Sequence, residues 1–245
     1  MNPEAWRALH RSRFPELPFD CGNRIDPGVI DTPHLRDWSR RETTPDQYRI
    51  EAYVDRFDLK AKRILHIGIG CSGLARRMHR RTGEIVGTSI DEPELEVARS
   101  LALPNYRAVI HNKFSGRDDA VPGTFDFIVD NNLTSACCCV THLAQLFGFL
   151  AAKLADDGQI VTDREGLSWI PEDANPRWSF TFDDLAAVAK EAGLSLYRIN
   201  CNVCVLARSQ PPKARPLPLL RHHVRQAPRA LIGACRRGLR LALRR

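Results

Sequence analysis

The chain has 245 residues, of which 43% are hydrophobic, so it can bury one sizeable α/β core with extensions but is tight for two full domains. Its net charge of +7 comes from residues 209–245, which carry Lys213 and nine arginines with no acid, whereas the rest of the chain is mildly acidic. The basic charge therefore indicates partners of the tail and says nothing of the substrate of the globular part.

No apolar run approaches the roughly 18 residues that a membrane span needs. The segment Met1–Phe14 is polar and basic and lacks the apolar stretch of a signal peptide. We therefore expect a cytoplasmic protein, in which only the tail is a candidate for peripheral membrane contact.

The eight cysteines are expected to be reduced thiols and not a disulfide framework. The adjacent Cys137, Cys138 and Cys139 are interpreted as small apolar side chains that pack against the sheet. A nucleophilic role would need a base, and none is adjacent in the sequence. Cys201 and Cys204 have C-x-x-C spacing, but on a strand their side chains point to opposite faces, which suits neither a disulfide nor a shared metal.

Residues 1–43 are expected to be irregular beyond their first dozen, because prolines interrupt the pattern. Four aromatic side chains suggest that this arm packs against the rest of the chain: Trp6, Phe14, Phe19 and Trp38. A helix then begins after Thr44 as N-cap, with Pro45 in its first position and Gln47 closing a capping box. Its apolar residues predict one buried face over the edge of the sheet: Ile50, Tyr53, Val54 and Phe57.

The most informative stretch is Ile64–Ala75, ILHIGIGCSGLA, in which a strand runs through three glycines into a helical pattern. Gly68, Gly70 and Gly73 let the backbone take positive φ and let a ligand approach the main chain closely. The helix that follows offers free N–H groups and the positive end of its dipole. This stretch predicts a cofactor loop.

Strands and helices alternate after this loop. The next strands are expected at Glu84–Ile90, Tyr106–Ile110, Phe125–Val129 and Gln159–Thr162, with helices at Pro93–Leu101, Thr141–Leu154 and Phe182–Ala192. Two closing strands, Leu194–Ile199 and Val203–Ala207, have no helix between them. The order predicts a doubly wound, mostly parallel, seven-stranded Rossmann-like α/β sheet with an antiparallel final strand pair.

The pattern stops after Gln210, where four prolines predict an extended linker: Pro211, Pro212, Pro216 and Pro218. Arg229–Arg245 has apolar residues on one helical face and arginines around the rest, which is typical of a basic amphipathic helix that binds an anionic membrane, RNA or a partner protein. A solvated tail without fixed structure is the alternative. The expected divisions are an N-terminal arm with its helix (1–59), the α/β domain (60–208), and the linker with its basic tail (209–245).

Four stretches occur in a fixed order: Ile64–Gly73, Ile85–Arg99 (IVGTSIDEPELEVAR), Phe125–Leu133 (FDFIVDNNL) and Leu150–Asp163 (LAAKLADDGQIVTD). Together they resemble the glycine loop, second strand and helix, fourth-strand motif, and helix, turn and fifth strand of the class I S-adenosylmethionine-dependent methyltransferases. The resemblance implies that residues 60–208 form a methyltransferase domain with S-adenosylmethionine as cofactor. The rival interpretation is an NAD-binding Rossmann oxidoreductase, since the glycines fit G-x-G-x-x-G and Asp91 follows at about the ribose-binding interval.

The resemblance implies cofactor contacts along the glycine loop, at His66, Gly68, Gly70, Ser72 and Gly73. Two of these positions depart from the family. His66 stands where an acid usually lies two residues before the first glycine, and Ser72 stands where the third loop glycine usually falls, with Gly73 one place later. We expect His66 to meet the methionine end of the cofactor or to be a hydrogen-bonded core histidine.

Further cofactor contacts are implied beyond the loop. Ser89 falls where the family has its ribose-binding acid. Asp91 is expected to reach the ribose hydroxyls instead, or to cap the following helix through an Asp91-x-x-Glu94 capping box. Asn112 follows the third strand, where the adenine contact of the family usually falls, and is expected to bond the adenine.

Methyl transfer to a hydroxyl requires that the acceptor be positioned and its proton removed. A base is therefore expected outside the carboxyl end of the fourth strand, where an open α/β sheet has its crevice. Asp130, beside the cofactor, is the first candidate, with Asn131 and Asn132 holding a polar acceptor; an Asx-rich turn that only ends the strand is the alternative. Weaker base candidates are His142, Asp163 and Glu165.

Asp130 and Asp163 together suggest a divalent metal, as in catechol-type methyltransferases, but too few ligands are visible and no metal is expected. The strand-end motif Asp-Asn-Asn-Leu differs from the Asn-Pro-Pro-Tyr type, which disfavours a DNA base as substrate. We expect O-methylation of a small polar metabolite or glycan-like precursor. The altered residues at positions 66, 72 and 89 leave open a cofactor-binding protein that keeps the fold without catalysis.

Overall fold

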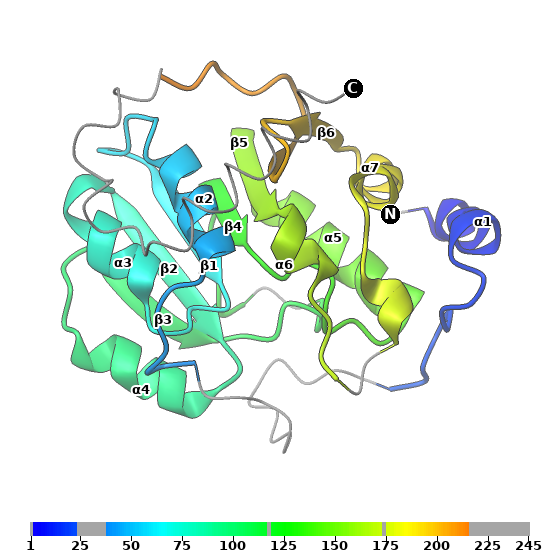
Figure 1. Cartoon of the computed structure of the whole chain (residues 1–245), viewed down its shortest axis with the longest axis horizontal. Coiled ribbons are helices and arrows are strands. Elements are labelled where there is room, and N and C mark those ends of the chain that lie inside the picture. The colour runs from blue at the N-terminus through cyan, green and yellow to red at the C-terminus, as the bar shows by residue number, and fades with distance from the viewer. Residues whose placement is uncertain (1, 24–37, 117–118, 173–174, 216–245) are drawn as a thin grey trace, which may run out of the picture. The chain divides into compact units, whose positions relative to one another are not determined.

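The computed structural model describes residues 2–23, 38–116, 119–172 and 175–215 (Figure 1). Residues Met1–Lys213 form one compact unit. The expected linker prolines at 216 and 218 and the basic helix Arg229–Arg245 lie outside the described residues. Within the described ranges, no helix has the length and apolar character of a membrane span.

The fold is built on one seven-stranded sheet with the strand order β3-β2-β1-β4-β5-β7-β6. Neighbouring strands are parallel from β3 to β5, and β7 pairs antiparallel with both β5 and β6. The strands are β1 (Arg63–Ile67), β2 (Glu84–Ser89), β3 (Tyr106–Ile110), β4 (Phe125–Asp130), β5 (Leu154–Asp163), β6 (Ser195–Arg198) and β7 (Val203–Ala207). The predicted sheet is confirmed, and β7 between β5 and β6 distinguishes it from the dinucleotide-binding order 3-2-1-4-5-6.

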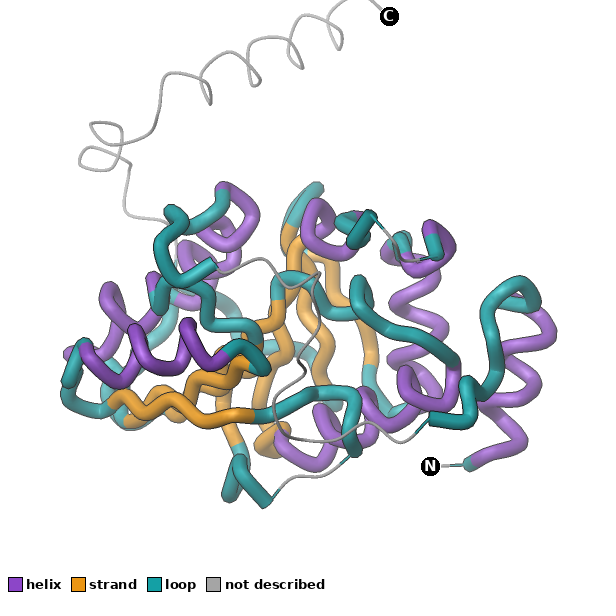
Figure 2. The backbone as a smooth tube through the Cα atoms, turned by 90° about the horizontal axis from the view of Figure 1, so that it is seen from below, coloured by secondary structure: helices purple, strands orange, loops and turns teal. Residues whose placement is uncertain are grey.

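Helices join the strands and lie on both sides of the sheet (Figure 2). They are α1 (Pro3–Arg13), α2 (Pro45–Val54), α3 (Gly73–Met78), α4 (Glu92–Ser100), α5 (Val140–Lys153), α6 (Arg164–Ser168) and α7 (Phe182–Glu191), with short 3₁₀ turns at His79–Arg81 and Pro176–Trp178. Parallel strands need such crossover connections, because the chain must return from the end of one strand to the opposite edge of the sheet before the next strand begins.

One strand boundary differs clearly from the prediction. β5 begins at Leu154 and not at Gln159, so the segment expected to turn is part of the strand. The pairing of β5 with β4 shifts register between Phe125 and Phe127, which takes up this irregular start. A Cβ at Gly158 would come within 2.8 Å of the Phe125 carbonyl oxygen, so glycine is needed there for close backbone packing and not for a turn.

The N-terminal arm contributes to the main core. Trp6 and Phe14 are 3% and 2% exposed. The Trp6 ring lies 6.5 Å from that of Phe147 in α5, and the Phe14 ring stacks on Phe180 at 4.9 Å. The prediction that this arm packs on the rest of the chain is therefore confirmed, although Phe19 is only half-buried.

Side-chain caps were predicted at the starts of α2 and α4, and neither forms, whereas the start of α7 is capped. Thr181 and Asp184 make a complete capping box at α7. Thr44 and Asp91 are the N-cap residues of α2 and α4, as predicted, but neither side chain bonds to its helix. Gln47 instead donates to Glu51 at 3.3 Å.

The described cysteines form no disulfide. Cys137 and Cys139 are buried, in agreement with the expected packing role, whereas Cys138 is exposed and departs from it. Cys204 is buried in β7, but Cys201 is exposed and lies before the strand, not in it. The two residues of the C-x-x-C pair thus have different environments.

Candidate active site

The glycine loop joins β1 to α3 through three residues in the left-handed region. Gly68 has φ +72°, Gly70 +48° and Ser72 +58°. Ser72 thus adopts the conformation that favours glycine, at the position where the resemblance places one. A Cβ at Gly68 would find no atom of the described residues within 4 Å, so this part of the loop has an open face.

The rest of the loop is packed. A Cβ at Gly70 would lie 3.6 Å from the Trp38 Cβ, and one at Gly73 would overlap the Thr43 hydroxyl. Ser72 is fully buried, and its hydroxyl is 2.9 Å from that of Tyr106. The segment before α2 therefore covers one side of the loop, and Gly68 keeps the open side.

His66 is the penultimate residue of β1 and is 3% exposed. Its Nε2 lies 3.4 Å from the Gln47 amide nitrogen of α2. Its Nδ1 has no hydrogen-bond partner among the described residues. Burial, with a smaller effect of the Arg77 charge, lowers the pKa of His66 to about 4, so the ring is neutral near pH 7.

A second polar group lies at the end of β2. The Ser89 hydroxyl donates to a Glu94 carboxylate oxygen at 2.7 Å and accepts from the Asp91 backbone N–H at 3.0 Å. Glu94 is 6% exposed, and burial, with the nearby Asp91 charge, raises its pKa. The serine that stands at the family's acid position is thus bonded to a carboxylate. From the sequence, Glu94 was expected only as a helix cap, because its contact with Ser89 depends on the fold of the turn.

Two buried residues, His111 and Asn112, follow the end of β3 at the carboxyl edge of the sheet. Asn112 is 3% exposed, and its side-chain oxygen accepts from the Phe114 backbone N–H at 3.0 Å. The preceding His111 stacks on the Phe149 ring at 4.7 Å. Asn112 therefore closes an Asx turn after the strand.

Asp130 is the last residue of β4 and pairs in register with Ile67, the last residue of β1. It is 2% exposed, and its carboxylate accepts from the Lys113 ammonium at 2.7 Å. Lys113 also donates to the Asn132 carbonyl at 2.7 Å. Burial raises the pKa of Asp130, and the Lys113 charge opposes that rise. Lys113 was not predicted as a site residue; its position directly after Asn112 was the available signal.

Helix α2 contacts the carboxyl ends of β1, β4 and β5, the first of them through Gln47 beside His66. The Asn131 amide donates to Asp46 in the first turn of α2, and a Cβ at Gly166 would overlap Asn131. The Arg49 guanidinium makes two hydrogen bonds of 2.8 Å to the fully buried Asp163. This helix therefore lies over the carboxyl edge of the sheet, as predicted.

The weaker base candidates are engaged elsewhere. Arg49 bonds Asp163 and also Glu165, the latter at 2.5 Å. The hydrogen bond to Asp163 raises the pKa of Arg49, although burial of the guanidinium acts in the opposite direction. With Asp130 and Asp163 each bonded to a protein cation, the described residues present no carboxylate pair for a metal at this edge. His142 lies in α5 against the Cys138 sulfur at 2.9 Å, and burial lowers its pKa.

No family model matches the chain, and no curated protein does. Solved structures do match. A sugar N-methyltransferase from Streptoalloteichus sp. is 13% identical with a TM-score of 0.55 over 76% of this chain and 98% of that chain. A TehB-like SAM-dependent methyltransferase from Corynebacterium glutamicum is 19% identical with a TM-score of 0.51 over 65% and 88%. A SAM-dependent methyltransferase from Aquifex aeolicus is 12% identical with a TM-score of 0.50 over 70% and 97%.

Proposed function

Since the chain has the fold of the class I S-adenosylmethionine-dependent methyltransferases, we propose that it is such an enzyme and transfers the methyl group to a hydroxyl of a small polar metabolite or glycan-like precursor. One observation carries the proposal. The open face at Gly68 follows β1 directly, and the buried Asp130 ends the neighbouring strand in register with Ile67. A cofactor loop and a base candidate thus lie at the same edge of the sheet.

The residues present fit the cofactor. The His66 Nδ1, buried and unpartnered among the described residues, is available to a polar atom of the methionine end. The carboxylate of Glu94 and the hydroxyl of Ser89 form a bonded pair where the ribose hydroxyls would need acceptors. Asn112 keeps its amide nitrogen for the adenine while its oxygen closes the turn. The pair of Ser89 and Glu94 supports binding despite the lost acid at position 89.

S-adenosylmethionine, when bound, supplies an electrophilic methyl group on a positively charged sulfur. The chain must then hold the acceptor hydroxyl in line and take up its proton. In our proposal Asp130 accepts that proton, because burial makes its carboxylate more basic than in water. Lys113 keeps the carboxylate ionised and fixes its orientation. Asn131 binds polar groups of the acceptor.

The acceptor class is supported by the polar lining of this edge and by one similar structure. Asp46, Asp130 and Asn131 supply carboxylate and amide groups that bind hydroxyls. A sugar N-methyltransferase has the same fold over most of its length. Sugars and related polyhydroxy compounds are therefore the acceptors to test first.

The test is release of S-adenosylhomocysteine from S-adenosylmethionine with a panel of sugars and hydroxylated metabolites. For the best acceptor, Asp130→Asn should lower kcat on the order of a hundredfold or more, because the amide takes up no proton. Asp126→Asn is the matched control. Asp126 lies on the same strand at the opposite end and also bonds a lysine, Lys62, at 2.7 Å.

Equal loss of kcat in both variants would mean that only the strand is perturbed. Full activity of Asp130→Asn would show that Asp130 is not the base. Binding of S-adenosylmethionine without turnover of any acceptor would favour the non-catalytic alternative.

A further inference from the structure

Three cysteine sulfurs lie around the ring of His142, which has no part in the proposed methyl transfer. Cys21 comes from the N-terminal arm, Cys138 and Cys139 from the loop before α5, and His142 from the first turn of that helix. Their ligand atoms all lie within 4.8 Å of one another. In the described part of the chain, no other group of three or more such residues has this spacing. We call these four residues the Cys–His cluster.

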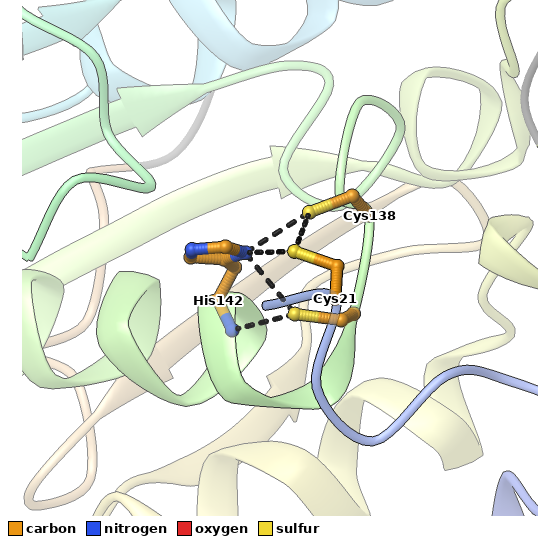
Figure 3. Close-up of side chains that lie close together, drawn as sticks. Cys21, Cys138 and His142 are labelled. Carbon is orange, nitrogen blue, oxygen red and sulfur yellow. Dashed lines mark hydrogen bonds between the residues drawn. The ribbon is translucent and has the colours of Figure 1, made fainter. Parts of the chain in front are cut away.

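The contacts converge on one atom. The Nδ1 of His142 is 2.9 Å from the Cys138 sulfur, 3.1 Å from the Cys139 sulfur and 3.5 Å from the Cys21 sulfur. The sulfurs of Cys21 and Cys138 are 3.5 Å apart. Figure 3 shows the His142 ring directed at the Cys21 and Cys138 sulfurs, which lie on neighbouring segments of chain.

Backbone hydrogen bonds fix the two segments independently of the sulfurs. The Val140 N–H donates to the Pro18 carbonyl at 2.9 Å, and the Thr141 N–H donates to the Phe19 carbonyl at 2.9 Å. These N–H groups belong to the first turn of α5, where a helix leaves its donors without internal partners. The arm therefore caps α5, and Cys21 follows two residues after the second contact.

Hydrogen bonding alone leaves this cluster unsatisfied. A ring nitrogen has either one N–H or one lone pair, so Nδ1 satisfies one sulfur and not three. A cation between the four atoms would satisfy all of them. Zinc bonds of about 2.3 Å to sulfur and about 2.0 Å to nitrogen place tetrahedral ligand atoms roughly 3.5–3.8 Å apart, close to the separation of the Cys21 and Cys138 sulfurs.

We propose that the Cys–His cluster is a structural zinc site. Three thiolates and one imidazole are a soft donor set that suits Zn²⁺, and four protein ligands close the coordination sphere, as in structural sites. On binding, each thiol gives its proton to solvent, and His142 binds through Nδ1 as the neutral ring. The ion would tie the arm to the start of α5, because Cys21 and Cys138 are 117 positions apart in the sequence. This proposal does not depend on methyl transfer.

From the sequence alone, no metal was expected and the cysteine triplet was assigned to packing. In the structure, Cys138 and Cys139 belong to the cluster and Cys137 does not. The Cys137 sulfur donates to the Cys139 carbonyl and lies outside the cluster. The pattern C-C-x-x-H of residues 138–142 was the visible signal. Its fourth ligand, Cys21, could be found only once the arm was placed on α5.

The test measures zinc in the full-length protein, stripped with a chelator under reducing conditions, reloaded with Zn²⁺ and freed of excess ion. We expect about one zinc per chain in the wild type and close to none in Cys21→Ser and Cys138→Ser. Co²⁺ in place of zinc should give the intense absorption of tetrahedral thiolate coordination in the wild type alone. Stripping should lower the Tm of the wild type but not that of Cys138→Ser.

Cys201→Ser is the matched control, because Cys201 is exposed like Cys138 but lies outside the cluster. It should keep its zinc. Since Cys138 is exposed, its replacement is expected to leave the fold intact, which circular dichroism checks. Equal zinc content in the wild type and Cys138→Ser would overturn the proposal. So would an intact mass that shows a Cys21–Cys138 disulfide in protein that takes up no zinc.

Discussion

His66 stands at the end of β1 as a neutral, buried ring, and its charge state couples folding to pH. Its pKa is about 4 in the folded protein and about 6.5 in an unfolded chain. The folded pKa is the lower one, so the unfolded state binds a proton first as the pH falls. The contribution of neutral His66 to the free energy of unfolding is therefore fully present above about pH 6.5. It is lost as the pH falls toward 4.

We therefore predict that His66→Gln flattens the acid side of the stability profile. Between pH 7 and pH 4, the wild type should lose about 3 kcal/mol more of its free energy of unfolding than the variant. Urea denaturation of both proteins at several pH values measures this difference. Parallel profiles would show that His66 does not titrate differently in the folded and unfolded states.

Single residues of the site were predictable where backbone conformation decides them. The positive φ of Gly68 and Gly70 follows from a strand that turns at once into a helix. The Lys113 bond to Asp130 was not predictable, because it joins the end of β3 to the end of β4 across the sheet. Such a contact exists only once the strand order is known.

Helix α2 is the element that covers the site, and the contacts of its polar face are its main feature. Gln47 lies near His66, and Arg49 bonds the fully buried Asp163. The N-cap, the first position and the buried Ile50, Tyr53 and Val54 were predictable from the sequence pattern. Phe57 departs from the prediction, because it lies after the end of the helix and is half-buried. The polar contacts were not, since Gln47 had been assigned to a capping box and bonds side chains instead.

Arg49→Met should destabilise the protein by roughly 3 kcal/mol, because it leaves a buried carboxylate without its cation. Arg198→Met is the control. Arg198 bonds Asp183 at 2.6 Å with both side chains more than half exposed, and such pairs contribute about 0–1 kcal/mol. The midpoints of urea unfolding for the two variants measure the difference. Similar midpoints would show that Arg49 does not stabilise the edge through Asp163.

At the scale of the whole molecule, the alternation of apolar strands and amphipathic helices was enough to predict the doubly wound sheet and its antiparallel final pair. The position of β7 between β5 and β6 was not predicted, because local sequence patterns do not determine the order of strands in a sheet. The complete Cys–His cluster could not be predicted, since only the C-C-x-x-H pattern is local and Cys21 joins it over a long sequence separation.

The central claim is that the open face of the glycine loop binds S-adenosylmethionine, and calorimetric titration tests it most directly when two glycines are compared. Gly68 and Gly193 have φ of +72° and +73°, and at neither position would an added Cβ lie within 4 Å of an atom in the described part of the chain. Gly193 lies between α7 and β6, at the far edge of the sheet. Alanine at either position costs about 1 kcal/mol or more of backbone strain.

We predict that the wild type and Gly193→Ala bind one S-adenosylmethionine per chain with equal affinity, whereas Gly68→Ala binds at least roughly tenfold more weakly, a loss of about 1.4 kcal/mol. Equal affinity of the two alanine variants would contradict the placement of the cofactor at Gly68. No binding of S-adenosylmethionine or S-adenosylhomocysteine by the wild type would contradict the account as a whole.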